Sequence, residues 1–390
     1  MRNGFRIIDS DAHVYEPLTL YDEYLPPDLR ERLPEIIRPR GGGTWTGNVI
    51  SIEDIEFEGR APFDLYPPDR WEHASRMAST YMEYCKFDER FADGAASDFD
   101  AASTLRAMDR EGIDVSLFHP SGLALYINSP NFDGVDPGLT GAFCTAYNNW
   151  LADFCKEDPQ RLKGVAVIPM REIEIAVTEA HRVVTELGMV AVVLRPDPCE
   201  GRRLDDPYNE PLYTEVEGLG VPLHIHHGTG GGGADRRFYG NHTMMKICSH
   251  PVEQMMACEA LIVGGVLERH PKLRVAFLEA GCGWIVYWLV RMGELLENFG
   301  THEAPDLRAE PMEYFRNQCF IATEEEEGED VAHVIARMGA NKVLWGSDYP
   351  HPDSAFPRSV ESFFDLRGIA EEDKRKILWD NPAGLYSIGP

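Results

Sequence analysis

The chain has 390 residues, of which 43% are hydrophobic, so it is long enough to bury a large globular core. Its formal net charge of -28 argues against nucleic acid and anionic membrane surfaces as partners. The sequence has no apolar run of membrane-spanning length, no basic-then-apolar leader, and no C-x-x-C pair among its eight cysteines. We therefore expect a cytoplasmic protein with reduced thiols.

Strand and helix patterns alternate along most of the chain. The first predicted strand covers 6–9, and the segment 17–100 after it is rich in Pro, Gly, Asp and Trp without helical or strand periodicity. Its length favours an inserted cover segment over a plain loop. Further strands are predicted at 113–119, 164–169, 190–194, 221–226, 273–278, 319–323 and 343–345, with helices at 101–111, 139–157, 173–187, 208–217, 250–269 (two helices), 285–296, 332–338 and 370–386.

Eight strands that alternate with helices predict an α/β fold, a single (β/α)8 TIM barrel over 1–390 with a long inserted segment after strand 1. A doubly wound open sheet is the alternative. It is disfavoured because no strand is followed by G-x-G-x-x-G or G-x-x-x-x-G-K-[ST]. The glycine-rich stretch 228–233 is interpreted as a mobile loop and not as a phosphate cradle.

Residue types that bind metal ions stand at the ends of four predicted strands. Asp11 and His13 follow the first strand, two residues apart, which puts both side chains on one face of an extended segment. The fifth strand ends in His224-Ile225-His226-His227, the sixth at Glu279 and the eighth just before Asp348. Because the carboxyl ends of barrel strands form one face, we expect these side chains to meet. Mixed carboxylates and imidazoles suit Zn, Mn or Fe(II) and exclude a soft thiolate site.

Each of these residues also has a purely structural interpretation. Glu279 and Asp348 suit turns or caps, and a histidine can simply fill a strand end. Four strand ends that each present a ligand-type residue are a stronger signal than any one of them, so the set predicts a metal site.

Five short motifs run from one end of the chain to the other: Ile8-Asp9-Ser10-Asp11-Ala12-His13, Val221-Pro222-Leu223-His224-Ile225-His226, Arg269-His270-Pro271-Lys272-Leu273-Arg274-Val275, Gly346-Ser347-Asp348-Tyr349-Pro350-His351 and Asn381-Pro382-Ala383-Gly384-Leu385-Tyr386. With them the sequence resembles the amidohydrolase superfamily, in the branch of TIM-barrel amidohydrolases and nonoxidative decarboxylases. The resemblance covers the chain outside about 38–98.

The resemblance implies roles for individual residues. Asp11 stands where the family has the first residue of His-x-His or Glu-x-His, and His13 stands at the second position. His226 matches the family's strand 5 histidine and Asp348 its strand 8 aspartate. Strand 6 usually ends in a histidine, whereas here it ends in Glu279, which is either a further metal ligand or a general base.

We expect a metal-dependent hydrolase. One divalent ion, zinc by preference and manganese or iron as alternatives, would be held by Asp11, His13, His226 and Asp348. Metal-activated water would attack a carbonyl in an amide, ester or lactone-like bond of a small molecule. Asp348 or Glu279 would accept the proton, and His227 or His351 would stabilise the oxyanion.

Two rival hypotheses use the same barrel. The first is a nonoxidative decarboxylase or hydratase that acts on an aromatic or unsaturated acid with the same metal. The second is a non-catalytic barrel that keeps the ligands for stability. Release of carbon dioxide without a hydrolysable bond would identify the decarboxylase.

Signals for the substrate are fewer. Arg195, at the end of the fourth strand, is a candidate for binding a substrate carboxylate or for bridging strand ends. His351 and His250, the latter one helical turn from Glu253, are further candidates for substrate binding. Aromatic residues of the insertion either line an apolar pocket or pack the segment onto the barrel: Trp45, Phe57, Phe63, Tyr66 and Trp71.

The remaining predictions concern the surface. Seven histidines are expected to be surface or packing residues: His73, His119, His181, His242, His270, His302 and His333. The resemblance implies a homodimer that packs through outer helices and the inserted segment. The apolar faces of 139–155 and 285–296 fit such an interface, and equally fit burial against the barrel.

Overall fold

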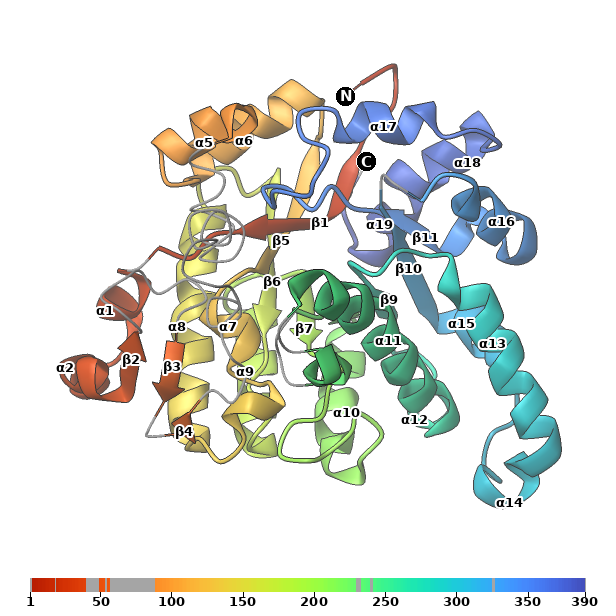
Figure 1. The fold of residues 1–390 in the computed structure, drawn as a ribbon, viewed down its shortest axis with the longest axis horizontal. Coiled ribbons are helices and arrows are strands. Elements are labelled where there is room, and N and C mark those ends of the chain that lie inside the picture. The colour runs from red at the N-terminus through yellow and green to blue at the C-terminus, as the bar shows by residue number, and fades with distance from the viewer. Residues whose placement is uncertain are drawn as a thin grey trace.

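The structure, a computed structural model, describes residues 2–17, 19–39, 49–52, 55–56, 88–228, 233–238, 241–324 and 327–389. Eight parallel strands form one sheet in which each strand pairs with the next in chain order (Figure 1). They are β1 (Ile8–Val14), β5 (Val115–Pro120), β6 (Leu162–Val167), β7 (Ala191–Leu194), β8 (Leu223–Ile225), β9 (Val275–Phe277), β10 (Cys319–Thr323) and β11 (Val343–Trp345).

The chain segment after β11 returns to the first strand. The N–H of Asp348 donates to the carbonyl of Asp11 at 2.9 Å, and the N–H of His13 donates to the carbonyl of Tyr349 at 2.7 Å. These bonds bring the two ends of the sheet together in a nearly closed barrel. The predicted TIM barrel is confirmed, and the open doubly wound sheet is wrong.

Helices surround the strands (Figure 1). The outer layer contains α6 (Ala101–Glu111), α8 (Pro137–Cys155), α9 (Ile173–Thr185), α10 (Glu210–Leu219), α11 (His242–Val263), α12 (Val266–Arg269), α13 (Trp284–Leu295), α15 (Pro311–Gln318), α16 (Glu329–Met338) and α17 (Ser359–Asp365). Local sequence sets their limits. In α6, the Asp100 side chain caps the N–H of Ser103, and Gly112 ends the helix with φ 80°. None of the described helices combines the length and hydropathy that crossing a bilayer requires.

Several predicted boundaries are wrong in instructive ways. The first strand runs over Ile8–Val14, because pairing with β5 continues to His13 and Val14, so Asp11 and His13 lie inside the strand. The predicted helix 370–386 is divided into α18 (Glu371–Arg375), a π-helical turn Lys376–Asp380 and α19 (Asn381–Leu385). By contrast, the limits of α6, β10 and β11 are as predicted.

The segment between β1 and α6 contains short elements that its sequence did not signal. They are α1 (Leu20–Tyr24), α2 (Pro27–Ile36), the antiparallel strands β2 (Ile37–Pro39), β3 (Val49–Ile52) and β4 (Ile55–Glu56), the 3-10 turn η4 (Glu89–Phe91) and α5 (Ala92–Ala96). The aromatic residues Trp45, Phe57, Phe63, Tyr66 and Trp71 lie outside the described residues.

The last part of this segment packs beside the barrel. Phe91 and Phe99 form a small apolar cluster with Tyr15, Tyr349 and Phe356, apart from the main core. Tyr15 follows β1 and Tyr349 follows β11, so the cluster covers the strands that carry candidate ligands.

The seven described cysteines are free thiols. Five of them are buried, namely Cys144, Cys199, Cys258, Cys282 and Cys319, and Cys85 lies outside the described residues.

Candidate metal centre

Four of the predicted ligand side chains meet at the carboxyl ends of the strands. From His13 Nε2 the distance to Asp348 Oδ1 is 3.3 Å and to Asp11 Oδ1 3.7 Å. His226 Nε2 lies 3.6 Å from the same Asp11 oxygen. His13 thus joins two groups of potential ligand atoms, one with Asp11 and His226 and one with Asp348, Glu279 and His351.

These atoms fit a bound cation better than they fit one another. Asp11 Oδ1, His13 Nε2, His226 Nε2 and Asp348 Oδ1 are all buried, and within the described part of the chain their close polar contacts are to other carboxylates and imidazoles, without a hydrogen bond of regular geometry. Leaving buried polar atoms without hydrogen bonds is costly, so a convergent group of them calls for another partner. Two carboxylate oxygens and two imidazole nitrogens are a suitable set for a divalent transition-metal ion.

Neighbouring groups orient these ligands. Nδ1 of His13 lies 3.2 Å from the carbonyl of Pro120, a contact that leaves Nε2 directed at the centre when Nδ1 carries the proton. The Gln254 amide of α11 donates to the carbonyls of Ile225, at 2.7 Å, and of Leu278, at 2.9 Å. Because His226 and Glu279 directly follow these residues, Gln254 fixes the strand ends that carry them.

Glu279 lies between the centre and helix α11. Its Oε2 is 2.8 Å from His226 Nε2 and 3.6 Å from His13 Nε2, whereas its Oε1 is 3.2 Å from His250 Nε2. The geometry allows the carboxylate to bind a metal ion or to connect the centre to His250. A further potential ligand group combines His13, Glu279, Asp348 and His351.

The backbone is strained at two of these positions. Glu279 has φ 48° and Asp348 has φ 52°, in the left-handed region that residues with a Cβ rarely adopt. Both follow the ends of barrel strands and both face the centre. Strain of this kind is concentrated at functional sites, where the surrounding structure holds it in place.

The charges at the centre are unbalanced. Burial raises the pKa of Asp348 well above its usual value, and the nearby Glu279 carboxylate raises it further. Burial alone would lower the pKa of His226, but the carboxylates of Glu279 and Asp11 raise it to about 10. A cation would relieve the repulsion between these carboxylates.

Arg195 and His227 form a polar wall beside the centre. Arg195, at the end of β7, makes a two-point ion pair with buried Asp197, with distances of 2.9 and 3.2 Å. Its Nη2 also lies 3.4 Å from His227 Nε2 and 3.4 Å from the carbonyl of Gly228. The His227 ring contacts that of His250, with centroids 5.6 Å apart.

His351 lies on the other side, after β11. Its Nδ1 is 2.6 Å from Asp348 Oδ1, and its ring centroid is 3.9 Å from that of His13. The Ser121 hydroxyl lies 3.0 Å from His351 Nε2 and 3.2 Å from His13 Nδ1, so it bridges the two rings.

Sequence reasoning missed His119, which it assigned to the surface or to packing. In the structure its Nδ1 is 3.2 Å from Asp11 Oδ1, and its Nε2 is 2.8 Å from Nδ1 of buried His224. The available signal was its place at the end of a predicted strand. Of the other histidines in that group, His181, His302 and His333 are exposed, His270 is buried beside Glu210, and the side chains of His73 and His242 lie outside the described part.

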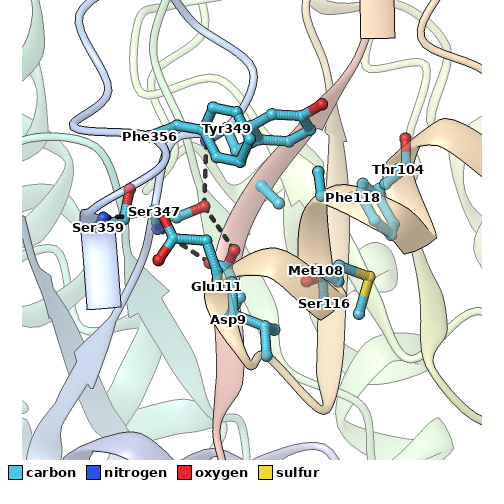
Figure 2. Close-up of a pocket in the computed structure, with 13 residues that line it drawn as sticks. Asp9, Thr104, Met108, Glu111, Ser116, Phe118, Ser347, Tyr349, Phe356 and Ser359 are labelled. Atoms are coloured by element: carbon cyan, nitrogen blue, oxygen red, sulfur yellow. Dashed lines mark hydrogen bonds between the residues drawn. The ribbon is translucent and has the colours of Figure 1, made fainter. Parts of the chain in front are cut away.

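Two small cavities lie near the centre but not in it. One is enclosed by β1, β5, α6 and the chain after β11, and Figure 2 shows Asp9, Glu111 and Ser347 in its lining. The other lies beside Arg195 and Asp197. Each has a volume of about 10 Å³, room for a water molecule and not for an organic substrate.

The comparisons with known proteins place this geometry in a family. The sequence matches the amidohydrolase family over residues 8–388. A gamma-resorcylate decarboxylase from Polaromonas sp. is 24% identical over 293 residues, 73% of this chain and 86% of the relative. A 2-amino-3-carboxymuconate-6-semialdehyde decarboxylase from Dictyostelium discoideum is 28% identical over 250 residues, 62% of this chain and 66% of the relative.

Solved structures share the fold. An amidohydrolase from Mycobacterium avium subsp. paratuberculosis has a TM-score of 0.75 at 22% identity and covers 98% of both chains. A dihydroxybenzoic acid decarboxylase from Polaromonas sp., solved with manganese and the inhibitor 2-nitroresorcinol, has a TM-score of 0.65 at 19% identity and covers 98% of this chain and 97% of its own.

These findings correct the predicted reaction. The relatives named above that match in sequence are decarboxylases, which are lyases, so the hydrolase expected from the sequence is wrong and its alternative is favoured. The prediction had interpreted the strand 6 carboxylate of Glu279, in place of the family's usual histidine, as a further metal ligand or a general base. The family match spans nearly the whole sequence, and the chain therefore belongs to the amidohydrolase family.

Proposed function

We propose that this chain is a metal-dependent nonoxidative decarboxylase that acts on a small aromatic or unsaturated carboxylic acid. The observation that carries the proposal is the grouping of buried carboxylate oxygens and imidazole nitrogens around His13 Nε2, from Asp11 and His226 on one side and Asp348 on the other. The similarity to two decarboxylases supports the choice of reaction.

The four ligand residues would hold one divalent ion. Manganese is the first ion to test because a structural neighbour contains it, and zinc remains the prediction from the sequence. When bound, the ion would act as a Lewis acid towards oxygen atoms of the substrate. The Glu279 carboxylate would lie beside the ion, in contact with the ligand His226.

The chain must supply a proton to the carbon that loses its carboxylate. In the reaction the C–C bond breaks, its electron pair stays on that carbon, a C–H bond forms and carbon dioxide leaves. The Asp348 carboxyl group would deliver this proton from the oxygen that does not bind the ion, and His351, whose Nδ1 lies 2.6 Å from Asp348 Oδ1, would position it. Ser121 would hold the His351 ring in position through its contact with Nε2.

The polar wall would orient the substrate. Arg195 is fixed by Asp197 and presents its guanidinium beside His227, so the pair is suited to bind oxygen substituents of the acid. His250 would contribute through Glu279, at 3.2 Å. The described end of the inserted segment, 88–100, packs against Tyr349 and Phe356 through Phe91 and Phe99 and would cover this side of the barrel.

A homodimer is part of the proposal. Exposed apolar side chains lie on two adjacent helices: Met244, Ile247 and Met256 on α11, and Tyr287 and Val290 on α13. The Trp288 indole N–H donates to the carbonyl of Met255 at 2.7 Å, which joins these helices. By contrast, α8 buries Leu139, Phe143, Tyr147 and Leu151. Light scattering of wild type and of Ile247→Asp would detect a dimer through this surface.

The test of the reaction is carbon dioxide release. The purified chain, loaded with Mn²⁺ or Zn²⁺, is incubated with hydroxylated benzoic acids and unsaturated dicarboxylic acids, and carbon dioxide and the decarboxylated product are measured. Metal-dependent release of both in equal amounts supports the proposal. Metal binding without turnover of any acid would contradict it and favour a non-catalytic barrel.

A further inference from the structure

One face of helix α11 carries polar residues towards the centre. Lys246, Ser249, His250 and Glu253 follow the spacing i, i+3, i+4 and i+7, so they share a face. His250 of this face contacts Glu279, and the Ser249 hydroxyl lies 2.9 Å from His250 Nδ1. Lys246 therefore lies one helical turn before a residue that touches the centre.

The ammonium group of Lys246 reaches across to the chain after β11. It forms an ion pair with Asp353, two residues beyond His351. The side chains of Lys246 and Asp353 are 28% and 45% exposed, more than that of Asp348 at the centre, which is 17% exposed. Exposed ion pairs of this kind contribute little to stability, so an incoming anion can replace Asp353.

The electrostatics of the centre make such a cation useful. Three acidic side chains, those of Asp11, Glu279 and Asp348, lie at the centre and disfavour a second anionic group there. Asp353, the partner of Lys246, lies two residues beyond His351, and the His351 ring contacts both Asp348 and His13, so Lys246 pairs with the stretch of chain that borders the centre. Arg195 also lies nearby, but both oxygens of Asp197 already offset its charge.

We propose that Lys246 anchors a second acidic group of the substrate, away from the carboxylate that is lost. The substrate class is therefore an acid with two anionic groups, one at the metal centre and one at the partly exposed Lys246. This inference rests on the proposed decarboxylase, because it assumes that the first carboxylate occupies the centre. Lys246 would exchange Asp353 for the substrate, and Asp353 would be its competitor.

Binding of two matched probes tests the anchor. Salicylate and 5-carboxysalicylate differ by one carboxylate, and their dissociation constants are measured by calorimetry on the manganese-loaded full chain. We expect wild type to prefer 5-carboxysalicylate by about tenfold or more, as for a charge-assisted hydrogen bond. Lys246→Gln should reduce the preference to about twofold or less, and Lys246→Arg should keep most of it.

Asp353→Asn shows whether Lys246 binds substrate or only forms a structural ion pair with Asp353. If Lys246 binds substrate, removal of the competing Asp353 carboxylate should tighten the binding of 5-carboxysalicylate and leave the affinity for salicylate unchanged. The proposal is overturned if wild type binds neither probe or shows no preference, if Lys246→Gln weakens both probes equally, or if Asp353→Asn weakens binding as Lys246→Gln does. A preference that depends on Lys246, without carbon dioxide release from any acid, keeps the anchor and rejects the decarboxylase.

Discussion

Ser347 and Asp9, 338 residues apart in the chain, are joined by two hydrogen bonds (Figure 2). The Ser347 N–H donates to Asp9 Oδ1 at 3.0 Å, and its hydroxyl donates to Oδ2 at 2.5 Å. The preceding residue, Gly346, approaches β1 so closely that a Cβ there would lie 2.5 Å from Asp11 Cβ. The Ser347 side chain and the close approach of the Gly346 backbone together hold Asp348 beside Asp11.

Ser347→Ala should therefore weaken metal binding while the fold is kept. The substitution removes the hydroxyl bond to Asp9, and loss of groups that orient metal ligands typically lowers metal affinity by about 10- to 100-fold. Competition between the protein and a fluorescent chelator for Mn²⁺ measures the change.

Ser354→Ala is the matched control for this experiment. Ser354 is buried on the same stretch after β11, and its hydroxyl has no hydrogen-bond partner among the described residues. It should leave the affinity nearly unchanged. An equal loss in both variants would show that the segment responds to any substitution, and that the link to Asp9 has no special role.

Removal of the metal should lower stability, and removal of a ligand should abolish this effect. A ligand that binds only the folded state at 100 times its dissociation constant adds about 2.7 kcal/mol to the free energy of unfolding. We expect Mn²⁺ to raise the melting temperature of wild type but not of Asp11→Ala or Asp348→Ala. Metal content by mass spectrometry should fall in parallel, from about one equivalent to near zero.

The control for these variants is His181→Ala. His181 is an exposed residue of α9 that pairs with Glu215 at 2.8 Å and belongs to neither group of potential ligands. It should retain the metal. Full metal content in Asp11→Ala and Asp348→Ala would contradict the assigned centre.

The candidate ligands could be predicted because they lie near the ends of buried strands, or just after them, and the patterns of these strands are local. The run Val343–Trp345, for example, leads directly to Asp348, and parallel barrel strands must bring such ends together. Local patterns do not show how adjacent strands are aligned. His119 faces Asp11 because β1 and β5 pair His13 with His119, after a register shift between Asp9 and Ala12. That alignment depends on contacts distant in sequence.

The helices that support the centre were equally hard to predict. The sequence placed the first residue of this helical region at 250, whereas α11 begins at His242. Lys246 was therefore assigned to no helix, and neither its position one turn before His250 nor the contact of Gln254 with two strand ends could be anticipated. Orientation of a helix is set by packing, which one sequence does not reveal.

Glu279→Gln should show whether Glu279 binds the metal or acts on the substrate. If Asp11, His13, His226 and Asp348 are sufficient ligands, the variant keeps about one equivalent of metal. Turnover should still fall, because the amide removes the negative charge that contacts His226 and His250 beside the centre. Loss of the metal would instead make Glu279 a ligand. Glu259→Gln, at an exposed position of α11, is the control and should change neither quantity.

Glu16 should make stability depend on pH. It is buried, accepts a hydrogen bond from the N–H of Gly122 at 3.0 Å, and burial raises its pKa to about 7 from an ordinary 4.5. Between these two values the folded state binds more protons than the unfolded state, so stability falls as the pH rises from about 4.5 to 7.

Glu16→Gln keeps an oxygen for Gly122 and removes the ionisation. At pH 8 it should stabilise the fold by up to about 3 kcal/mol relative to wild type, and at pH 4 by little, as the two pKa values imply. Denaturant unfolding at both pH values measures the difference. Glu157→Gln, at an exposed position, should show no such pH-dependent gain. Equal effects of Glu16→Gln on stability at both pH values would mean that the wild-type Glu16 carboxyl titrates normally. A gain in stability confined to high pH would identify Glu16 as a buried acid with a raised pKa.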